Sequence, residues 1–162
     1  MQNTLKLVHD LSDSQVVEVV KELFNIVYTH VPYKQIKDNS EAVAEVAQLA
    51  SLDAEVMKHE LSAVDSARFG RLVLEQYARD PELAPFVEQA WDKIQGSDNL
   101  IIDVILALGL VVNLTLLVAT TKVQVQKGTD GKTSWTFGKK EAEEGLVRAV
   151  VNPLVKVAKS TS

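Results

Sequence analysis

The chain of 162 residues has the length of one compact domain and is long enough to bury a hydrophobic core. Hydrophobic residues make up 46% and charged residues 24%, which excludes a disordered chain, and the count of 0 cysteines excludes disulfides, thiolate catalysis and cysteine-based zinc sites. The net charge of -5 is unevenly divided, with 9 basic and 18 acidic residues up to residue 121 and 8 basic and 4 acidic residues after it. This asymmetry favours contact with an anionic surface or an acidic neighbour.

The first predicted helix starts after Leu11. Ser12 is a preferred N-cap residue, and Gln15 stands three positions later, as a capping box requires. Leu11 and Val16 have the spacing of a hydrophobic staple, and the helix ends near Pro32, because the residue before a proline is pushed out of the helical region. Its apolar stripe consists of Val16, Val20, Leu23, Val27 and Val31, widened by Phe24 and Tyr28.

Residues 39 to 64 carry two further helical patterns. Asn39 or Ser40 caps an alanine-rich helix whose small side chains permit close helix packing, and Ser51 or Asp53 caps the helix after it. The second of these helices carries three apolar residues at core spacing, Met57, Leu61 and Val64.

Two more helices are predicted up to Gly96. The first restarts at residues 65 and 66 and carries the stripe Phe69, Leu72, Val73 and Tyr77. Pro81 and Pro85 lie four residues apart and do not fit comfortably in one helix, so we expect a turn at residues 80 to 84 with Pro85 in the first turn of the next helix. That helix ends at Gly96 as a left-handed C-cap. It buries Phe86, Ala90, Trp91 and Ile94.

The longest apolar segment covers residues 100 to 119 and is predicted to form one helix capped by residues 97 to 99. A helix of roughly 18 to 20 residues is long enough to span a bilayer. Asp103 in its first turns, the polar Asn113 and Thr115 and the lack of an export signal in the first ten residues argue against a permanent span. Besides such a span, two favoured readings stay open: a central core helix, or a sheathed helix that inserts into a membrane once released. The insertion candidates are Val104, Leu108, Val112 and Leu116.

A β-hairpin is predicted after this segment. Residues 121 to 127 and 132 to 137 alternate between apolar and polar positions with a period of two. A three-residue loop with Gly131 left-handed gathers the apolar residues on one face, with Val125 opposite Trp135 and Val123 opposite Phe137. A lone hairpin is marginal in water, so this face needs a helix, a partner or a membrane to cover it. A final helix is expected from residue 141.

Residue patterns that carry catalysis or bind cofactors are missing from the sequence. The 3 histidines, His9, His30 and His59, stand at no ligand spacing from one another. Gly131, Lys132 and Thr133 resemble part of a phosphate loop, but they sit inside a hairpin and not between a strand and a helix. We therefore predict no catalytic residues, no metal, no cofactor and no enzymatic activity.

Two surfaces of the predicted hairpin are candidates for binding. The apolar face is predicted to contact a protein partner or a second copy of the chain, through Val123, Val125, Trp135 and Phe137. Lysines are predicted to contact an anionic surface, and these are Lys122, Lys127, Lys132, Lys139 and Lys140. We do not expect nucleic acid as a partner, because the aromatic face is needed for packing and the isoelectric point is about 5.2.

Two segments carry a resemblance to known proteins. The sequence Ala-Arg-Asp-Pro-Glu-Leu-Ala at residues 78 to 84, between two helices, resembles the amino-terminal helical modules of small bacterial proteins found beside effector genes in immunity and conflict systems. The order of apolar helix, strand, Asp-Gly turn, strand and final helix is similar to effector-associated accessory modules of those systems. The resemblance covers about a third of the chain. It implies a protein that binds, recruits or is acted on, and it carries over no catalytic residue; the long apolar segment departs from the pattern.

The sequence thus predicts a mainly α fold: a bundle of about five to seven helices with one long apolar central helix, plus a β-hairpin and a final helix. Residues 1 to 97 form the acidic helical bundle, and residues 98 to 162 form the remainder, packed with the first part as one unit. The predicted function is a non-enzymatic adaptor or assembly protein in a bacterial defence or conflict system. The alternative is a pore-forming or membrane-disrupting effector that uses residues 100 to 119. We expect a cytoplasmic location, with membrane association conditional on release of the apolar helix.

Overall fold

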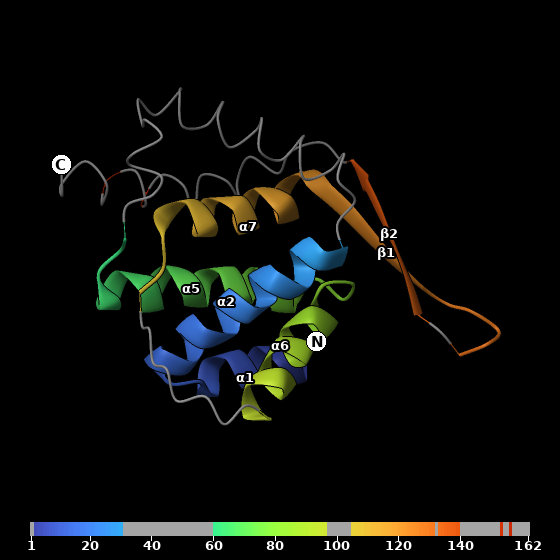
Figure 1. The fold of residues 1–162 in the computed structure, drawn as a ribbon, viewed down its shortest axis with the longest axis horizontal. Helices are drawn as coiled ribbons and strands as arrows, with labels where there is room; N and C mark the ends of the chain where they lie inside the picture. The colour runs from blue at the N-terminus through green and yellow to red at the C-terminus, as the bar shows by residue number, and fades with distance from the viewer. Residues whose placement is uncertain are drawn as a thin grey trace.

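The computed structural model describes residues 2–30, 60–96, 105–131 and 133–139, together with residues 153 and 156. Five helices and a two-stranded sheet make up this part of the chain (Figure 1). In chain order they are α1 (Gln2–Asp10), α2 (Asp13–His30), α5 (Ala63–Arg79), α6 (Ala84–Gln95), α7 (Leu108–Thr120), β1 (Thr121–Lys127) and β2 (Thr133–Lys139). The prediction of a mainly helical bundle is confirmed. The helices expected to start near residues 39 and 51 lie outside the described residues, as does the final helix apart from Pro153 and Lys156.

The start of α2 has the predicted capping box. The backbone N–H of Ser12 donates to Oε1 of Gln15 over 2.8 Å, and the N–H of Gln15 donates to Oγ of Ser12 over 3.3 Å. These bonds satisfy two amides that a helix start leaves unpaired. Leu11 and Val16, the two residues of the predicted staple, are both buried.

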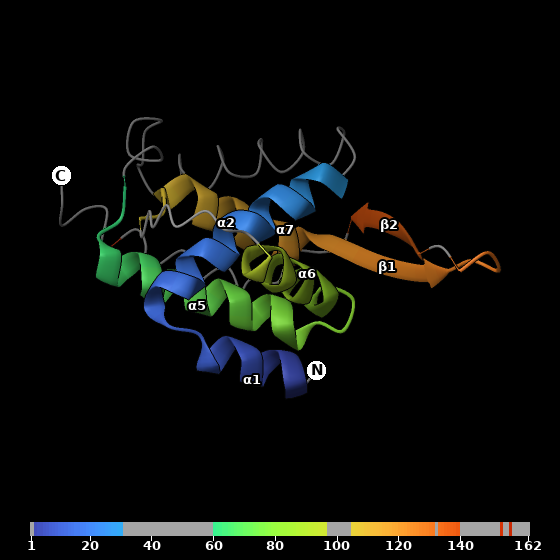
Figure 2. The same ribbon diagram turned by 60° about the horizontal axis from the view of Figure 1, so that its bottom comes forward.

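Helix α1 is an element that the sequence analysis did not predict. Its carboxyl end is held by Arg71 of α5, whose guanidinium donates to the carbonyl of Val8 over 2.6 Å and to that of Leu11 over 2.9 Å. Oγ1 of Thr4 donates to Oε1 of Glu88 over 2.6 Å. α1 lies on the side of α5 away from α7 (Figure 2). Distant side chains thus complete this helix, which explains the lack of a local signal.

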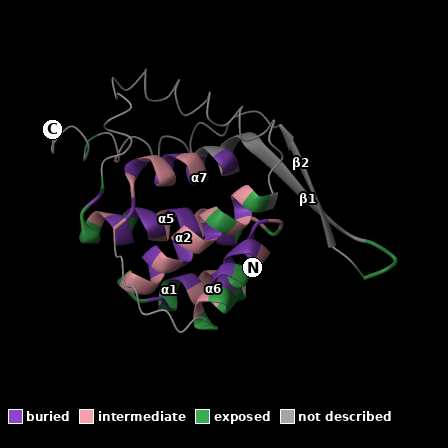
Figure 3. Ribbon diagram, in the orientation of Figure 1, coloured by how far each residue is buried: buried purple, intermediate pink, exposed green. Residues whose placement is uncertain are grey.

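The core lies among α2, α5, α6 and α7, which carry most of the buried residues in the described part of the chain (Figure 3). α2 packs against both α5 and α6, and α5 packs against α7. Gly70 allows α2 to approach α5 closely, because a Cβ atom at this position would lie 3.0 Å from Cγ1 of Val16. The largest fully buried side chains include Tyr77, Phe69, Phe86, Leu23, Leu74, Leu106, Leu108, Leu114 and Leu117.

Helix α5 begins at Ala63, between Leu61 and Val64, two residues predicted to lie in the same helix. Ser62 is its N-cap and accepts the N–H of Asp65 over 3.1 Å, so Leu61 lies before the helix. Val64, predicted to be a core residue, is 76% exposed; that prediction is wrong, because the helix has only just begun and turns this position outward. Further along, the predicted stripe is confirmed: Phe69, Val73 and Tyr77 are buried and Leu72 is half-buried.

The turn before α6 is the one that the prolines predict. The N–H of Ala84 donates to the carbonyl of Asp80 over 2.8 Å, and Pro85 stands in the first turn of the helix. Phe86 and Ala90 are buried, and Trp91 and Ile94 are half-buried against the core. The left-handed cap predicted at Gly96 is wrong: its φ is -81°, because its N–H continues the helical bonding to the carbonyl of Asp92 over 3.2 Å.

The prediction of one long apolar helix is wrong in the described residues. Helix α7 has 13 residues and begins at Leu108. Just before it, Leu106 lies outside the helix: its N–H donates to Oγ of Ser66 over 2.8 Å and its carbonyl accepts the N–H of Leu61 over 2.8 Å. Ala107 forms a β-bridge with Glu60. Because these partners take the backbone groups that a helix would use, the helix cannot run through Leu106.

Candidate interaction surface

Strands β1 and β2 pair antiparallel, with Val125 opposite Trp135 and Val123 opposite Phe137. Gly131 has a φ of 80° and its N–H donates to the carbonyl of Gly128 over 3.0 Å, which closes the turn. Directly paired residues belong to the same face of an antiparallel ladder. The pairing therefore places the four residues proposed for partner binding together on one face of the hairpin, which we call the apolar hairpin face.

Lysines stand at both ends of this face. Lys127 is paired with Thr133, and Lys139 is paired with Thr121. Both pairs are an even number of positions from Val123 and Val125 along the strands and therefore belong to the same face. Lys122 is paired with Gly138, and this pair belongs to the opposite face of the hairpin. The remaining anionic-surface candidates, Lys132 and Lys140, lie outside the described residues.

The hairpin extends beyond the helices, and its turn lies farthest from them in both views (Figures 1 and 2). Residues 128 to 131 at this turn are exposed. Helix α7 runs directly into β1, since Thr120 ends the helix and Thr121 begins the strand. The position of α7 in the helical bundle therefore sets the direction in which the hairpin projects.

Two tyrosines hold α7 in place. The hydroxyl of Tyr77 donates to the carbonyl of Leu114 over 3.1 Å, and that of Tyr28 donates to Oδ1 of Asn113 over 3.3 Å. Asn113 also donates through Nδ2 to the carbonyl of Gly109 over 2.7 Å. Burial raises the pKa of the Tyr77 phenol well above its ordinary value, and Tyr28 raises it further. Tyr77 is therefore a neutral hydrogen-bond donor inside the bundle.

Two of the four membrane-insertion candidates are buried in the described part of the chain. Leu108 and Val112 are buried in the core around α7, while Val104 and the side chain of Leu116 lie outside what the structure describes. Among the described residues, no helix combines the length and the apolar character needed to cross a bilayer.

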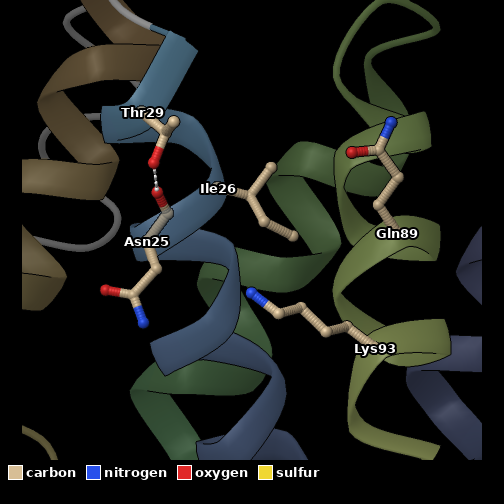
Figure 4. A pocket seen from close by; sticks show the side chains of 5 residues that line it. All are labelled: Asn25, Ile26, Thr29, Gln89 and Lys93. Carbon is tan, nitrogen blue, oxygen red and sulfur yellow. Dashed lines mark hydrogen bonds between the residues drawn. The ribbon is translucent and has the colours of Figure 1, made fainter. Parts of the chain in front are cut away.

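A pocket of about 310 Å³ lies between α2 and α6 (Figure 4). Ile26 of α2 is directed toward α6, and the side chain of Lys93 is directed from α6 toward α2. Nζ of Lys93 lies 2.7 Å from Oε1 of the largely buried Glu22, and the hydroxyl of Thr29 donates to the carbonyl of Asn25 over 2.6 Å. We call this the α2–α6 pocket. The residues that line it are Asn25, Ile26, Thr29, Gln89 and Lys93.

The pocket combines one apolar surface with several polar groups. Ile26 offers the apolar contact, and the exposed amide of Gln89 offers a carbonyl oxygen as acceptor, whereas the amide of Asn25 is directed away from α6 (Figure 4). Lys93 adds a positive charge, and its ammonium is held at the edge of the pocket by the ion pair with Glu22.

Sequence reasoning missed the α2–α6 pocket. Asn25 and Thr29 interrupt the apolar pattern of α2 at helical spacing, which marks them as solvent-facing but does not reveal the neighbouring helix. The packing of α2 on α6 joins segments about sixty residues apart, and no local pattern encodes it.

The described residues hold no group of three or more acidic or histidine side chains able to bind a metal ion. Comparison of the chain with protein-family models, with curated proteins and with solved structures finds no match. The hairpin and the α2–α6 pocket are therefore the features of the described residues that bear on function.

Proposed function

We propose that this chain is a non-enzymatic assembly protein, in which the helices form a scaffold and the hairpin binds a second copy of the chain. The observation that carries the proposal is the projecting hairpin, whose register gathers Val123, Val125, Trp135 and Phe137 on one face. A two-stranded sheet is marginal alone, so an apolar face on it favours contact with another surface.

Charge supports a second copy as the partner. The chain is basic from residue 122, with 8 basic and 4 acidic residues, and acidic before it, with 9 basic and 18 acidic residues. Lys127 and Lys139 at the ends of the apolar hairpin face would repel a second hairpin placed against it, but they complement the acidic helices of another molecule. The favoured contact is therefore between the hairpin of one copy and the helices of the next.

Sedimentation velocity of the purified chain over a range of concentrations tests the proposal. The intact chain should form larger species as its concentration rises, and Trp135→Ser should shift this association to at least about tenfold higher concentration. Thr136→Ser, on the opposite face of the same strand, is the matched control and should behave as the intact chain. Added salt should weaken the association, since exposed charges take part. A chain that remains monomeric at every concentration would overturn the proposal.

A further inference from the structure

We propose that the α2–α6 pocket is the receptor for the hairpin of the neighbouring copy, and that it takes the indole of Trp135. This inference rests on the proposed function and names the surface on the helices that the hairpin meets. The pocket is formed by residues of α2 and α6, whereas the hairpin continues from the far end of α7 and extends away from both helices (Figures 1 and 4).

The chemistry of the pocket suits an indole. Small-molecule pockets have volumes of about 300 to 1,000 Å³, and the volume of about 310 Å³ at the lower limit fits a single aromatic side chain better than an extended ligand. Ile26 supplies an apolar contact for the ring, and the amide carbonyl of Gln89 is an acceptor for the indole N–H, which needs a partner when it is buried. The ammonium of Lys93 can interact with the face of the ring.

The charges around the pocket match those of the hairpin. Glu88 and Asp92 of α6 are exposed and directly precede Gln89 and Lys93 in the sequence. On α2, Glu18 and Glu22 precede the lining residues by one or two helical turns. Both helices thus carry carboxylates within two turns of the pocket, although Glu22 is paired with Lys93 and Glu88 accepts a hydrogen bond from Thr4, while the hairpin carries lysines at the ends of its apolar face.

This contact joins two different surfaces and is therefore heterologous. Each copy has one hairpin to give and one pocket to receive, so the contact repeats from molecule to molecule and produces a ring or an open chain. A symmetric dimer would require both contacts to form at once between the same two copies.

Separate variants of the hairpin and the pocket test this inference. Trp135→Ser removes the indole, and the double substitution Asn25→Lys with Gln89→Lys adds bulk and positive charge at two exposed helical positions of the pocket wall. We expect each variant to weaken association at least about tenfold by sedimentation velocity. The matched control, Asn3→Lys with Gln95→Lys, makes the same chemical changes at two exposed positions outside the pocket and should associate as the intact chain does.

Mixing the two variants provides the decisive experiment. The Trp135→Ser chain keeps an intact pocket and the doubly substituted chain keeps an intact hairpin, so an equimolar mixture should form a one-to-one dimer that grows no further. A mixture that remains monomeric would overturn the inference. Circular dichroism of each chain alone establishes that the helices are folded. Trp135→Phe serves as a second hairpin variant, with an intermediate loss of association, because it keeps the ring but removes the N–H donor.

Two further results separate this inference from the function on which it rests. If the pocket variant associates as the intact chain does while Trp135→Ser does not, the hairpin binds elsewhere and only the inference fails. If the intact chain never associates, the proposed function fails as well.

Discussion

The helices bury their large side chains against one another, whereas the hairpin extends beyond them and is organised by pairing between two neighbouring strands. The contacts of the helices join distant segments: Arg71 bonds to Val8 across 63 positions, and Thr4 to Glu88 across 84. The hairpin needs only a turn and an alternating pattern. Substitutions in the helices should therefore change the free energy of unfolding, while substitutions in the hairpin should change association.

The sharpest form of this contrast compares two aromatic residues. Phe69 is fully buried in α5, so Phe69→Ala should lower the free energy of unfolding by about 3 to 5 kcal/mol, through lost apolar burial and a residual cavity. Trp135→Ala in the projecting hairpin should lower it by less than about 1 kcal/mol. Urea denaturation of monomeric samples, followed by circular dichroism, measures both. A Trp135 variant as unstable as the Phe69 variant would remove the distinction between scaffold and binding element.

Within the helices, Arg71 ties α1 to α5. Arg71→Met should cost about 2 to 3 kcal/mol, since it leaves the carbonyls of Val8 and Leu11 without their charged donor. Arg68→Met is the matched control: Arg68 is exposed and lies 5.0 Å from the ring of Phe69, so its loss should cost under about 1 kcal/mol. Equal costs for the two substitutions would show that the guanidinium of Arg71 does not hold α1.

The late start of α7 is tested by Ser66→Ala. The hydroxyl of Ser66 is fully buried and accepts the N–H of Leu106, so its removal leaves a buried amide unpaired and should cost about 1 to 3 kcal/mol. Urea denaturation gives the value. If Ser66→Ala leaves the free energy of unfolding unchanged, this bond does not decide where the helix begins.

The smallest expected effect concerns Tyr77 and depends on pH. Tyr77→Phe should cost about 1 kcal/mol near neutral pH, because the bond to the carbonyl of Leu114 is lost. The unfolded chain ionises this phenol near pH about 10, whereas burial keeps it protonated in the folded chain because its pKa is raised. The stability that Tyr77 contributes is therefore complete below that pH and decreases above it. Denaturation at increasing pH should show a smaller alkaline loss for Tyr77→Phe; parallel curves would contradict this.

The parts of the fold that the sequence predicts are those with local causes. The capping box of Ser12 and Gln15, the turn around Pro81 and Pro85 and the stripe through Phe69 and Tyr77 depend on residues a few positions apart. The pairs Val123 with Phe137 and Val125 with Trp135 follow from alternation and a three-residue turn. The same local pattern led to the hairpin residues of the candidate site, whose role in binding stays a prediction.

The parts that the sequence does not predict depend on distant partners. Helix α1 is completed by a guanidinium from α5, and the apolar segment is interrupted at Leu106 by a hydroxyl and an amide forty or more positions away. The α2–α6 pocket exists only where two separate helices meet. Hydropathy alone cannot locate such contacts. A long buried helix and a short buried helix preceded by a buried non-helical segment both require apolar side chains.

Emission from Trp135 tests the central claim, that the hairpin is the binding element, most directly. The chain has 2 tryptophans, Trp91 and Trp135, so Trp91→Phe leaves the hairpin residue as the sole reporter. Trp91 is half-buried at the core, and phenylalanine keeps much of its contact there. As the concentration of this variant rises, the emission maximum should move to shorter wavelength in parallel with the increase in sedimentation coefficient, because the indole enters a neighbouring molecule. An emission maximum that stays constant while larger species form would contradict the account.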